Sequence, residues 1–532
     1  MALLLGIDAG TTSLKVALFD DTGAELAIAV EHYSLVTPKP GRAELDPDLY
    51  WASLTAGVRR VLLRALARAS DVVALAVSSQ GETIIPVAAD GRALGPAVVW
   101  LDNRAVDEAR QLGEQFERST VYAVTGVPTM VPTWPACKLL WWKGHDPDLF
   151  RHAAHFPLVE EFLLYRLTGR FVAEAGVQST SLLYDIGRHT WWQAMLDFIG
   201  LSTTRLGDLL APGEVAGPLL PGVANDLGLS PGIPVIAGGM DQGAGAVGVG
   251  NVLSGLLSES TGGALTVQAS IDRPGGDLSG QTPVYVHSVP NSYLYCPVGP
   301  TGGMTLTWFR DHFGQAELAR AEASGVDAYE LLTEMAASAP PGAAGLTLLP
   351  HLSGAFSPEY EPAARGVFFG FTLGHGREHF VRAILEGVAF MLRRNVELLR
   401  SLGVNAQQLH SHGGGARSPL WNQIKADVCS LPVVTLQGAD AAVRGDAMLA
   451  GLAVGTFTTL AQACDAAIRP RARFEPDPST GRLYETAYRR YVDLFEALRP
   501  LFAWTGTASD QGEDSSPSVL ATGQLGRISR DR

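Results

Sequence analysis

Residues 3–23 read LLLGIDAGTTSLKVALFDDTG, and the rest of the chain is best interpreted outward from this stretch. An apolar run from Leu3 to Ile7 stops at Asp8, a short polar segment follows, and a second apolar run resumes at Val16. Alternating apolar residues predict strands, and the glycine-containing segment between them predicts a tight connection. The stretch therefore predicts a β-hairpin that carries a carboxylate at its tip.

The residues of this tip suit the binding of a phosphate. Gly10 allows successive backbone N–H groups to point into one concavity, Asp8 can hold a hydrated magnesium ion, and Lys15 adds a positive charge. The neighbouring hydroxyl donors are Thr11, Thr12 and Ser13. The alternative is an ordinary tight hairpin with one exposed aspartate, because short glycine-rich signals are common.

The segments that follow indicate an α/β domain. Residues 1–35 predict three strands in a meander, and a helix is expected from Pro47, with Asp46 as its N-cap. VVALAVSSQ, residues 72–80, reads as a short buried strand, and AVVWLDNRA, residues 97–105, as another. Meander, helix and strand in this order predict a sheet with mixed strand directions and helices packed on it.

The second half of the chain repeats this organisation. GLLSESTGGALTVQAS, residues 255–270, again places a glycine-rich tip between two apolar runs, which indicates a duplicated domain with a phosphate-facing hairpin in each half. The glycine-rich residues 238–250 suit a hinge. We predict an N-terminal domain over residues 1–248, a C-terminal domain over 249–505 and a disordered tail over 506–532.

Length, net charge and cysteine content limit the possible domain organisation and binding partners of the chain. A chain of 532 residues is too long for one core and predicts two large domains. The net charge of -14 argues against non-specific binding of nucleic acid or of an anionic membrane surface. The four cysteines lie far apart and predict neither a metal site nor a disulfide framework. Without a signal peptide or a membrane-spanning run, the chain is expected in the cytoplasm.

Four glycine-rich stretches stand at predicted strand ends, at residues 8–13, 238–243, 261–263 and 413–415. Together they resemble the FGGY family of carbohydrate kinases, and the resemblance covers about residues 3–500. Its most specific segment is HGGGARSPLWNQIKADV, at residues 412–428. GVFFGFTLGHGREHFVRAILEG resembles the C-terminal signature of the family, and PACKLLWW a degraded form of its N-terminal signature.

The resemblance implies a fold and a reaction. The fold is α/β, with two domains of the actin/Hsp70/hexokinase-type ATPase fold (ribonuclease H-like, mixed sheets with helices) around a central cleft. The reaction is the ATP-dependent phosphorylation of a sugar hydroxyl with Mg²⁺. By the same resemblance, Asp241 is the general base, Asp8 holds magnesium through water, and Lys15 meets the phosphates with Thr11, Thr12 and Ser13. The residues implied on the nucleotide side are Gly262, Gly263, Gly303, Gly414 and Gly415.

The sugar side is predicted from SSQGETIIP and VVWLDNRA. Glu82 matches a carboxylate that accepts hydrogen bonds from polyol hydroxyls, Trp100 is expected to stack on the sugar, and Gln242 follows the catalytic base. Asp102 and Arg104 are expected on the same wall. Structural alternatives remain open: Glu82 as a buried acid, Trp100 as a core aromatic residue, and Asp102 with Arg104 as an ion pair.

The substrate is interpreted as a pentulose such as xylulose, with glycerol, erythritol or another polyol as the alternative. SQGET resembles glycerol kinases, whereas WLDNRA resembles the xylulokinase-like branch. A non-catalytic sugar sensor on the same fold is a rival function, against which the joint presence of Asp8, Asp241 and the glycine run speaks. A second rival, a chaperone-like ATPase, is expected to need a separate peptide-binding domain, for which residues beyond 500 leave no room. The expected partner is a small sugar or polyol, with no nucleic acid and no membrane, and a homodimer is one candidate assembly.

Two positions depart from the family pattern. Gly263 stands where relatives usually carry a threonine, so Thr261 or backbone N–H groups must contact the phosphate instead. Phe371 replaces an aliphatic residue in the C-terminal signature. His410 and His412 alternate along a predicted strand and, without a third ligand, are interpreted as ordinary strand residues.

Overall fold

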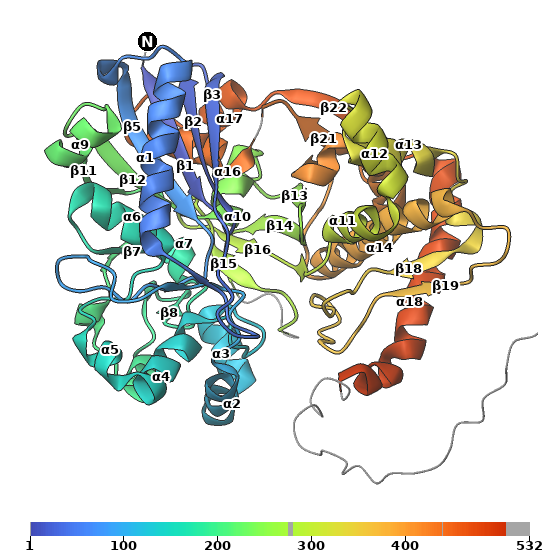
Figure 1. Ribbon diagram of the computed structural model, residues 1–532, viewed down its shortest axis with the longest axis horizontal. Coiled ribbons are helices and arrows are strands. Elements are labelled where there is room, and N and C mark those ends of the chain that lie inside the picture. The colour runs from blue at the N-terminus through green and yellow to red at the C-terminus, as the bar shows by residue number, and fades with distance from the viewer. Residues whose placement is uncertain (1, 275–279, 439, 507–532) are drawn as a thin grey trace, which may run out of the picture.

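The computed structural model of the protein describes residues 2–274, 280–438 and 440–506. Within this range the chain forms two lobes, each built on one large sheet (Figure 1). The tail predicted to be disordered lies outside the described residues, apart from Gly506, which ends the last helix, α18. No helix of the described chain is long and apolar enough to cross a membrane. All four cysteines are free.

The first sheet has the strand order β11-β12-β5-β1-β2-β3. Its strands are β1 (Leu3–Ala9), β2 (Ser13–Asp20), β3 (Glu25–His32), β5 (Val72–Ser79), β11 (Val215–Pro218) and β12 (Pro234–Met240). β1 pairs antiparallel with β2, as the opening stretch predicts, and parallel with β5. β5 is in turn parallel to β12. The carboxyl ends of β1, β5 and β12 therefore lie at one edge of the sheet.

The second sheet has the order β15-β16-β14-β13-β20-β21-β22, with β17 also paired to β14. Its strands are β13 (Leu256–Thr261), β14 (Leu265–Ile271), β15 (Val284–Val286), β16 (Tyr293–Tyr295), β17 (Val298–Gly299), β20 (Gln408–His412), β21 (Val433–Leu436) and β22 (Pro470–Phe474). β13 pairs antiparallel with β14 and parallel with β20, and β20 is parallel to β21. The two sheets thus share one topology, which confirms the predicted duplication.

Helices and short strand pairs complete both lobes. In the first half the helices are α1 (Pro47–Arg64), α2 (Val106–Gln115), α3 (Arg118–Thr125), α4 (Pro135–His145), α5 (Pro147–His152), α6 (Val159–Thr168), α7 (Ala175–Gln178), α8 (Gln193–Ile199), α9 (Pro221–Leu227) and α10 (Asp241–Gly248). In the second half they are α11 (Met304–Phe313), α12 (Gln315–Ser324), α13 (Ala328–Ala337), α14 (Arg377–Ser401), α15 (Pro419–Cys429), α16 (Ala441–Ala453), α17 (Leu460–Ala467) and α18 (Pro478–Gly506). The short pairs are β4 (Glu44–Leu45) with β6 (Ala97–Val98), β7 (Val172–Glu174) with β10 (Asp208–Leu210), β8 (Tyr184–Asp185) with β9 (Thr190–Trp191), and β18 (Thr347–Leu349) with β19 (Val367–Phe369).

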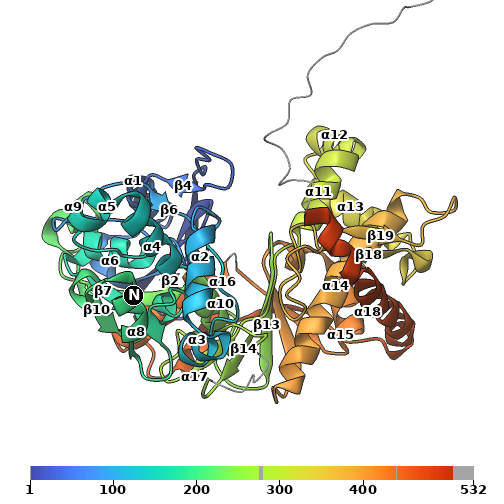
Figure 2. The ribbon, with the colours of Figure 1, turned by 90° about the horizontal axis from the view of Figure 1, so that it is seen from below.

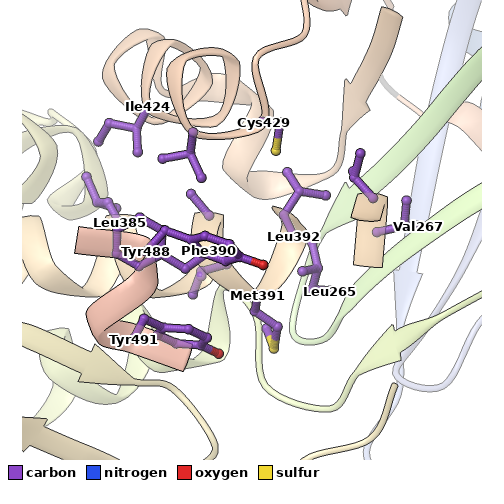
Figure 3. Close-up of a cluster of buried hydrophobic side chains, with 14 of the residues drawn as sticks. Leu265, Val267, Leu385, Phe390, Met391, Leu392, Ile424, Cys429, Tyr488 and Tyr491 are labelled. Carbon is purple, nitrogen blue, oxygen red and sulfur yellow. The ribbon is translucent and has the colours of Figure 1, made fainter. Parts of the chain in front are cut away.

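Sequence signals for several of these elements are visible in the structure. The side chain of Asp46 accepts a hydrogen bond from the N–H of Asp48, which makes it the N-cap of α1 as predicted. The core of the second lobe gathers around α14, where Phe390 and Met391 pack with Tyr488 and Tyr491 of α18 (Figure 3). Burial of this apolar surface is the main free-energy gain that fixes the second sheet to its helices.

Two helices of the second half, α16 and α17, belong to the first lobe. α16 follows β21 of the second sheet, yet it packs on the first sheet beside α10 (Figure 2). The approach is close: a Cβ at Gly248 would meet the Ala441 carbonyl oxygen at 1.8 Å, and a Cβ at Gly445 would meet that of Ala244 at 1.9 Å. The chain therefore crosses between the lobes, and a glycine-tight helix pair joins them.

Candidate active site

Asp8 ends up buried at the carboxyl edge of the first sheet, opposite Lys15 on β2 and Ser78 on β5. Both of its contacts are long: Lys15 Nζ and Ser78 Oγ each lie 3.4 Å from a carboxylate oxygen. The single hydroxyl proton of Ser78 goes to Asp446, at 2.8 Å. Burial raises the pKa of Asp8, although Lys15 acts against the shift. The carboxylate is thus fixed in place with lone pairs left for a ligand.

The hydroxyls of the first hairpin differ in availability. Thr11 Oγ1 donates to Gln80 at 2.6 Å and accepts from the indole nitrogen of Trp100 at 2.9 Å, so it is engaged inside the protein. Thr12 is exposed and Ser13 is half-buried, and neither side chain has a hydrogen-bond partner within the described chain. A phosphate at this tip would therefore meet Thr12 and Ser13, whereas Thr11 positions the tip against Trp100.

Asp241 is the first residue of α10 and directly follows β12. Burial raises its pKa to about 7, and the negative charge of Asp8 adds to the shift. The side-chain amide of Gln242 donates to Asp241 Oδ1 at 3.3 Å, and Gln268 of β14 donates to Gln242 at 2.7 Å. A carboxylate that titrates near neutral pH and is held in orientation suits a general base.

Glu82 lies within electrostatic reach of Asp241. Burial raises the pKa of Glu82 to about 8, with a further contribution from Asp241, while Lys138 acts in the opposite direction. Its backbone has φ of +59°, a left-handed conformation that costs energy for a residue other than glycine. Such strain is found mostly at functional sites.

Lys138 of α4 is hydrogen-bonded to the segment that contains Glu82 and to the strand before Trp100. It is fully buried, and its ammonium group donates to the carbonyl oxygens of Glu82, Val98 and Val99 at 2.8, 3.3 and 3.0 Å. Burial lowers its pKa to about 7. The lysine is part of PACKLLWW, but the sequence assigns no role to it, because its partners lie about 40 and 56 residues away. It ties the Glu82 loop to the strand before Trp100.

Trp100 and Asp102 lie where that strand ends. Trp100 is half-buried: it packs against the first core while its indole N–H donates to Thr11. The expectation that Asp102 lines the sugar side is corrected by its surroundings, because its side chain is fully buried and both carboxylate oxygens accept hydrogen bonds. The N–H of Ala43 donates to one oxygen at 2.7 Å, and the guanidinium group of Arg104 donates to both. These bonds lower the pKa of Asp102 against the effect of burial. Asp102 anchors Arg104 and does not face a ligand.

The second hairpin contributes a cavity of about 670 Å³. The predicted nucleotide-side residues all line it: Gly262, Gly263, Gly303, Gly414 and Gly415. A Cβ at Gly303 would meet the carbonyl oxygen of Gly262 at 2.5 Å, and one at Gly415 would meet the side chain of Thr261 at 2.7 Å. Only glycines allow the hairpin, the start of α11 and the loop before α15 to approach this closely.

Beneath the hairpin lies a fully buried ion pair. Lys425 Nζ is 2.7 Å from Glu259 Oε1, and both side chains are 0% exposed. The second oxygen of Glu259 accepts the hydroxyl of Thr261 at 2.7 Å. Thr261 therefore cannot donate to a phosphate, and the N–H of Gly262 is bonded to Ala264 at 3.0 Å. The N–H of Gly263 has no acceptor among the described residues, which leaves the backbone to replace the missing threonine.

Comparison with known proteins agrees with this arrangement. The N-terminal domain model of the FGGY family of carbohydrate kinases matches residues 3–248, and its C-terminal domain model matches residues 281–454. The chain belongs to the FGGY family of carbohydrate kinases. It is therefore a phosphotransferase that uses ATP to phosphorylate a sugar hydroxyl.

Its similarity to individual members extends over almost the whole chain. It is 30% identical to xylulose kinase of Escherichia coli over 510 residues, which cover 94% of this chain and 100% of that protein. It is 28% identical to xylulose kinase of Bacillus subtilis, covering 94% and 98%. The crystal structure of xylulose kinase from Rhodospirillum rubrum matches with a TM-score of 0.84 at 27% identity, covering 94% and 100%.

Proposed function

We propose that this carbohydrate kinase transfers the γ-phosphoryl group of ATP to a terminal hydroxyl of a pentulose such as xylulose. The observation that carries the proposal is the carboxyl pair of Asp241 and Glu82, whose pKa values are raised to about 7 and about 8 at one edge of the first sheet. The similarity to xylulose kinases along nearly their entire length supports the choice of sugar.

The carboxyl groups of Asp241 and Glu82 have different roles in this proposal. Asp241 accepts the proton of the attacking hydroxyl, and Glu82, whose pKa is raised to about 8, keeps its own proton near neutral pH. A protonated Glu82 both donates and accepts hydrogen bonds, which fits a sugar hydroxyl better than a bare carboxylate does. Gln242, held by Gln268, adds a fixed amide beside the base.

The phosphate side is built from both hairpins. In the first, Thr12, Ser13 and Lys15 would contact the phosphates, and in the second the free N–H of Gly263 would do so. Asp8 fits a magnesium ion, because it is buried, its contacts are long and Mg²⁺ is commonly held by one carboxylate and several waters. When bound, the ion would neutralise charge that develops on the transferred phosphoryl group.

The electrostatics of the sugar side favour an uncharged substrate. In the described part of the chain, the cations that act most strongly on Glu82 and Asp241 are Lys138 and Lys15. Lys138 is bonded to three carbonyl oxygens, and Lys15 lies between two aspartates. Neither is free to pair with the carboxylate of a sugar acid, so a ketose or polyol should be preferred over an aldonate. A cytoplasmic location and a homodimer stay predictions.

A substrate panel tests the proposal. The purified protein with MgATP is given xylulose, ribulose, glycerol, erythritol or gluconate, and ADP release is followed by a coupled assay, with Asp241→Asn as the blank. We expect the highest kcat/KM with xylulose and none above the blank with gluconate. A best rate with glycerol or erythritol would establish the polyol alternative instead. If none of these five compounds raised ADP release above the rate without sugar, the substrate would lie outside the pentuloses and polyols named here and the proposal would be wrong.

A further inference from the structure

The charged residue nearest to Lys15 is far from it in the sequence. Asp8 Oδ2 lies 3.4 Å from the ammonium group, whereas Asp440 Oδ2 lies 2.8 Å away. Lys15 is on β2 of the first sheet, and Asp440 precedes α16, which the chain enters from the second sheet. The shorter of the two ion pairs is therefore made across 425 positions of the sequence, at the point where the chain crosses between the lobes.

Asp440 uses its two oxygens for different tasks. One oxygen accepts the N–H of Ala442 at 3.1 Å and caps α16, and the other binds Lys15. Burial works against the charge of Asp440, but Lys15, together with His412 and the N–H of Val443, outweighs burial and lowers the pKa of the carboxyl. Asp440 is therefore ionised and stays a partner for Lys15 over the physiological pH range.

We propose that Asp440 is a positioning residue that draws the Lys15 ammonium group away from Asp8 and so keeps Asp8 open for the metal that accompanies the nucleotide. Without Asp440, Lys15 would have one carboxylate left within reach, and the ion pair with Asp8 would tighten. A lysine fully paired with Asp8 competes with a cation for the same oxygens. This inference rests on the proposed function, because it takes Mg²⁺ and a nucleotide as the ligands of the hairpin.

The helix α16 gives this arrangement a rigid base. It is the counterpart of α10, the helix that begins at Asp241, and the two pack through the glycine contacts at Gly248 and Gly445. Asp241 and Asp440 thus stand near the amino ends of two helices that cannot slide freely past each other. In this proposal α10 carries Asp241, the base for the sugar hydroxyl, and α16 carries Asp440, which holds the ammonium group of Lys15 near the phosphates.

Asp440→Asn separates the charge from the cap, because asparagine caps a helix as well as aspartate does. Binding of ADP is measured by calorimetry on the full chain, with Mg²⁺ and with EDTA, which needs no knowledge of the sugar. We expect the gain in ADP affinity on adding Mg²⁺ to shrink about tenfold in Asp440→Asn, as for the loss of one charge-assisted hydrogen bond. The control is Asp46→Asn, a cap of α1 without a lysine partner, which should retain the wild-type gain.

The double variant Lys15→Met/Asp440→Asn decides whether Asp440 acts through the lysine. If it does, adding Asp440→Asn to Lys15→Met changes the Mg²⁺-dependent gain by less than about twofold. Additive losses, an unchanged gain in Asp440→Asn, or a collapse of its melting temperature relative to Asp46→Asn would each overturn the inference. If wild-type protein failed to bind ADP at all, the proposed function itself would fall instead.

Discussion

The two lobes share one sheet topology but present opposite chemistry at the same edge. At the first hairpin, charged side chains converge: Asp8, Lys15 and, from the end of β12 beyond β5, Asp241. At the second, the equivalent tip is nearly bare, and glycines with backbone N–H groups line the cavity. The duplicated fold supplies two similar sheets, and the proposed function assigns proton transfer and metal binding to the first and nucleotide packing to the second.

The largest effect should come from the base of the first lobe. In Asp241→Asn the shape and the bond to Gln242 can remain, but the proton acceptor is lost. We expect kcat to fall by about 10²–10⁴, with the KM values for sugar and ATP close to wild type. Steady-state kinetics with the preferred sugar measure this. Turnover within a few-fold of wild type would remove Asp241 from the role of base.

The pH dependence of kcat/KM in the wild-type protein also tests whether Asp241 is the general base. Because the base must be ionised, kcat/KM should decline as pH falls through about 7, following the raised pKa of Asp241. The residual activity of Asp241→Asn should lack this limb. An identical limb in the variant would assign the titration to another group.

At the nucleotide cavity of the second lobe, adding a side-chain atom should weaken ATP binding, because glycines line the closest contacts there. In Gly303→Ala the new Cβ would meet the Gly262 carbonyl oxygen at 2.5 Å and push the hairpin away from α11. We expect the KM for ATP to rise by about tenfold to a hundredfold, the size of a 1–3 kcal/mol overpacking cost, with an unchanged KM for sugar. Gly144→Ala, where nothing lies within 4 Å of the new atom, is the matched control. Equal kinetics for both variants would contradict the packing argument.

Glu82 tests whether the sugar side works through a protonated carboxyl. Removing its hydrogen bonds in Glu82→Ala should raise the KM for sugar about tenfold, as expected for one or two neutral bonds. Glu82→Gln keeps a neutral donor and acceptor, so it should stay within about threefold of wild type at pH 7. If the glutamine variant were as impaired as the alanine variant, the sugar would require the ionised form. An unchanged KM with a lowered melting temperature would indicate a structural acid.

The smallest expected effect is on stability. The pKa values of Glu82, Glu161, Glu174 and Asp241 are raised by burial to about 8, 8, 7 and 7. Stability from a raised carboxyl pKa is complete below the unfolded pKa and is lost as pH rises through the folded one. The melting temperature should therefore fall by about 3–8 °C between pH 6 and pH 9. Calorimetry checks this, and a flat or rising curve would contradict these shifts.

The elements with local signals were predictable from the sequence. The hairpin of residues 3–20 follows from apolar alternation, α1 from its cap, and the second hairpin from the repeated pattern. The glycines of the nucleotide cavity lie where the family pattern places them. Each of these signals is a motif of residues that lie close together in the chain, even where several motifs meet at one cavity.

What the sequence missed depends on distant partners. The buried ammonium of Lys138 under the Glu82 loop, and Asp440 beside Lys15, join segments that no local pattern connects. Asp102 was expected on the sugar wall, but Arg104 and Ala43 take its oxygens. The hydroxyl of Thr11 was expected to meet a phosphate and instead bonds Gln80. The crossing of α16 to the first sheet is likewise set by tertiary packing of small residues.

One crossed binding experiment tests the division of labour between the lobes most directly. Calorimetry gives the affinities of Glu82→Ala and Gly303→Ala for xylulose and for MgADP, each ligand titrated alone. The division predicts that Glu82→Ala weakens only the sugar and Gly303→Ala only the nucleotide, each by about tenfold with the other affinity within about twofold. If either variant weakened both ligands equally, or if the effects were exchanged, the assignment of sugar to the first lobe and nucleotide to the second would be wrong.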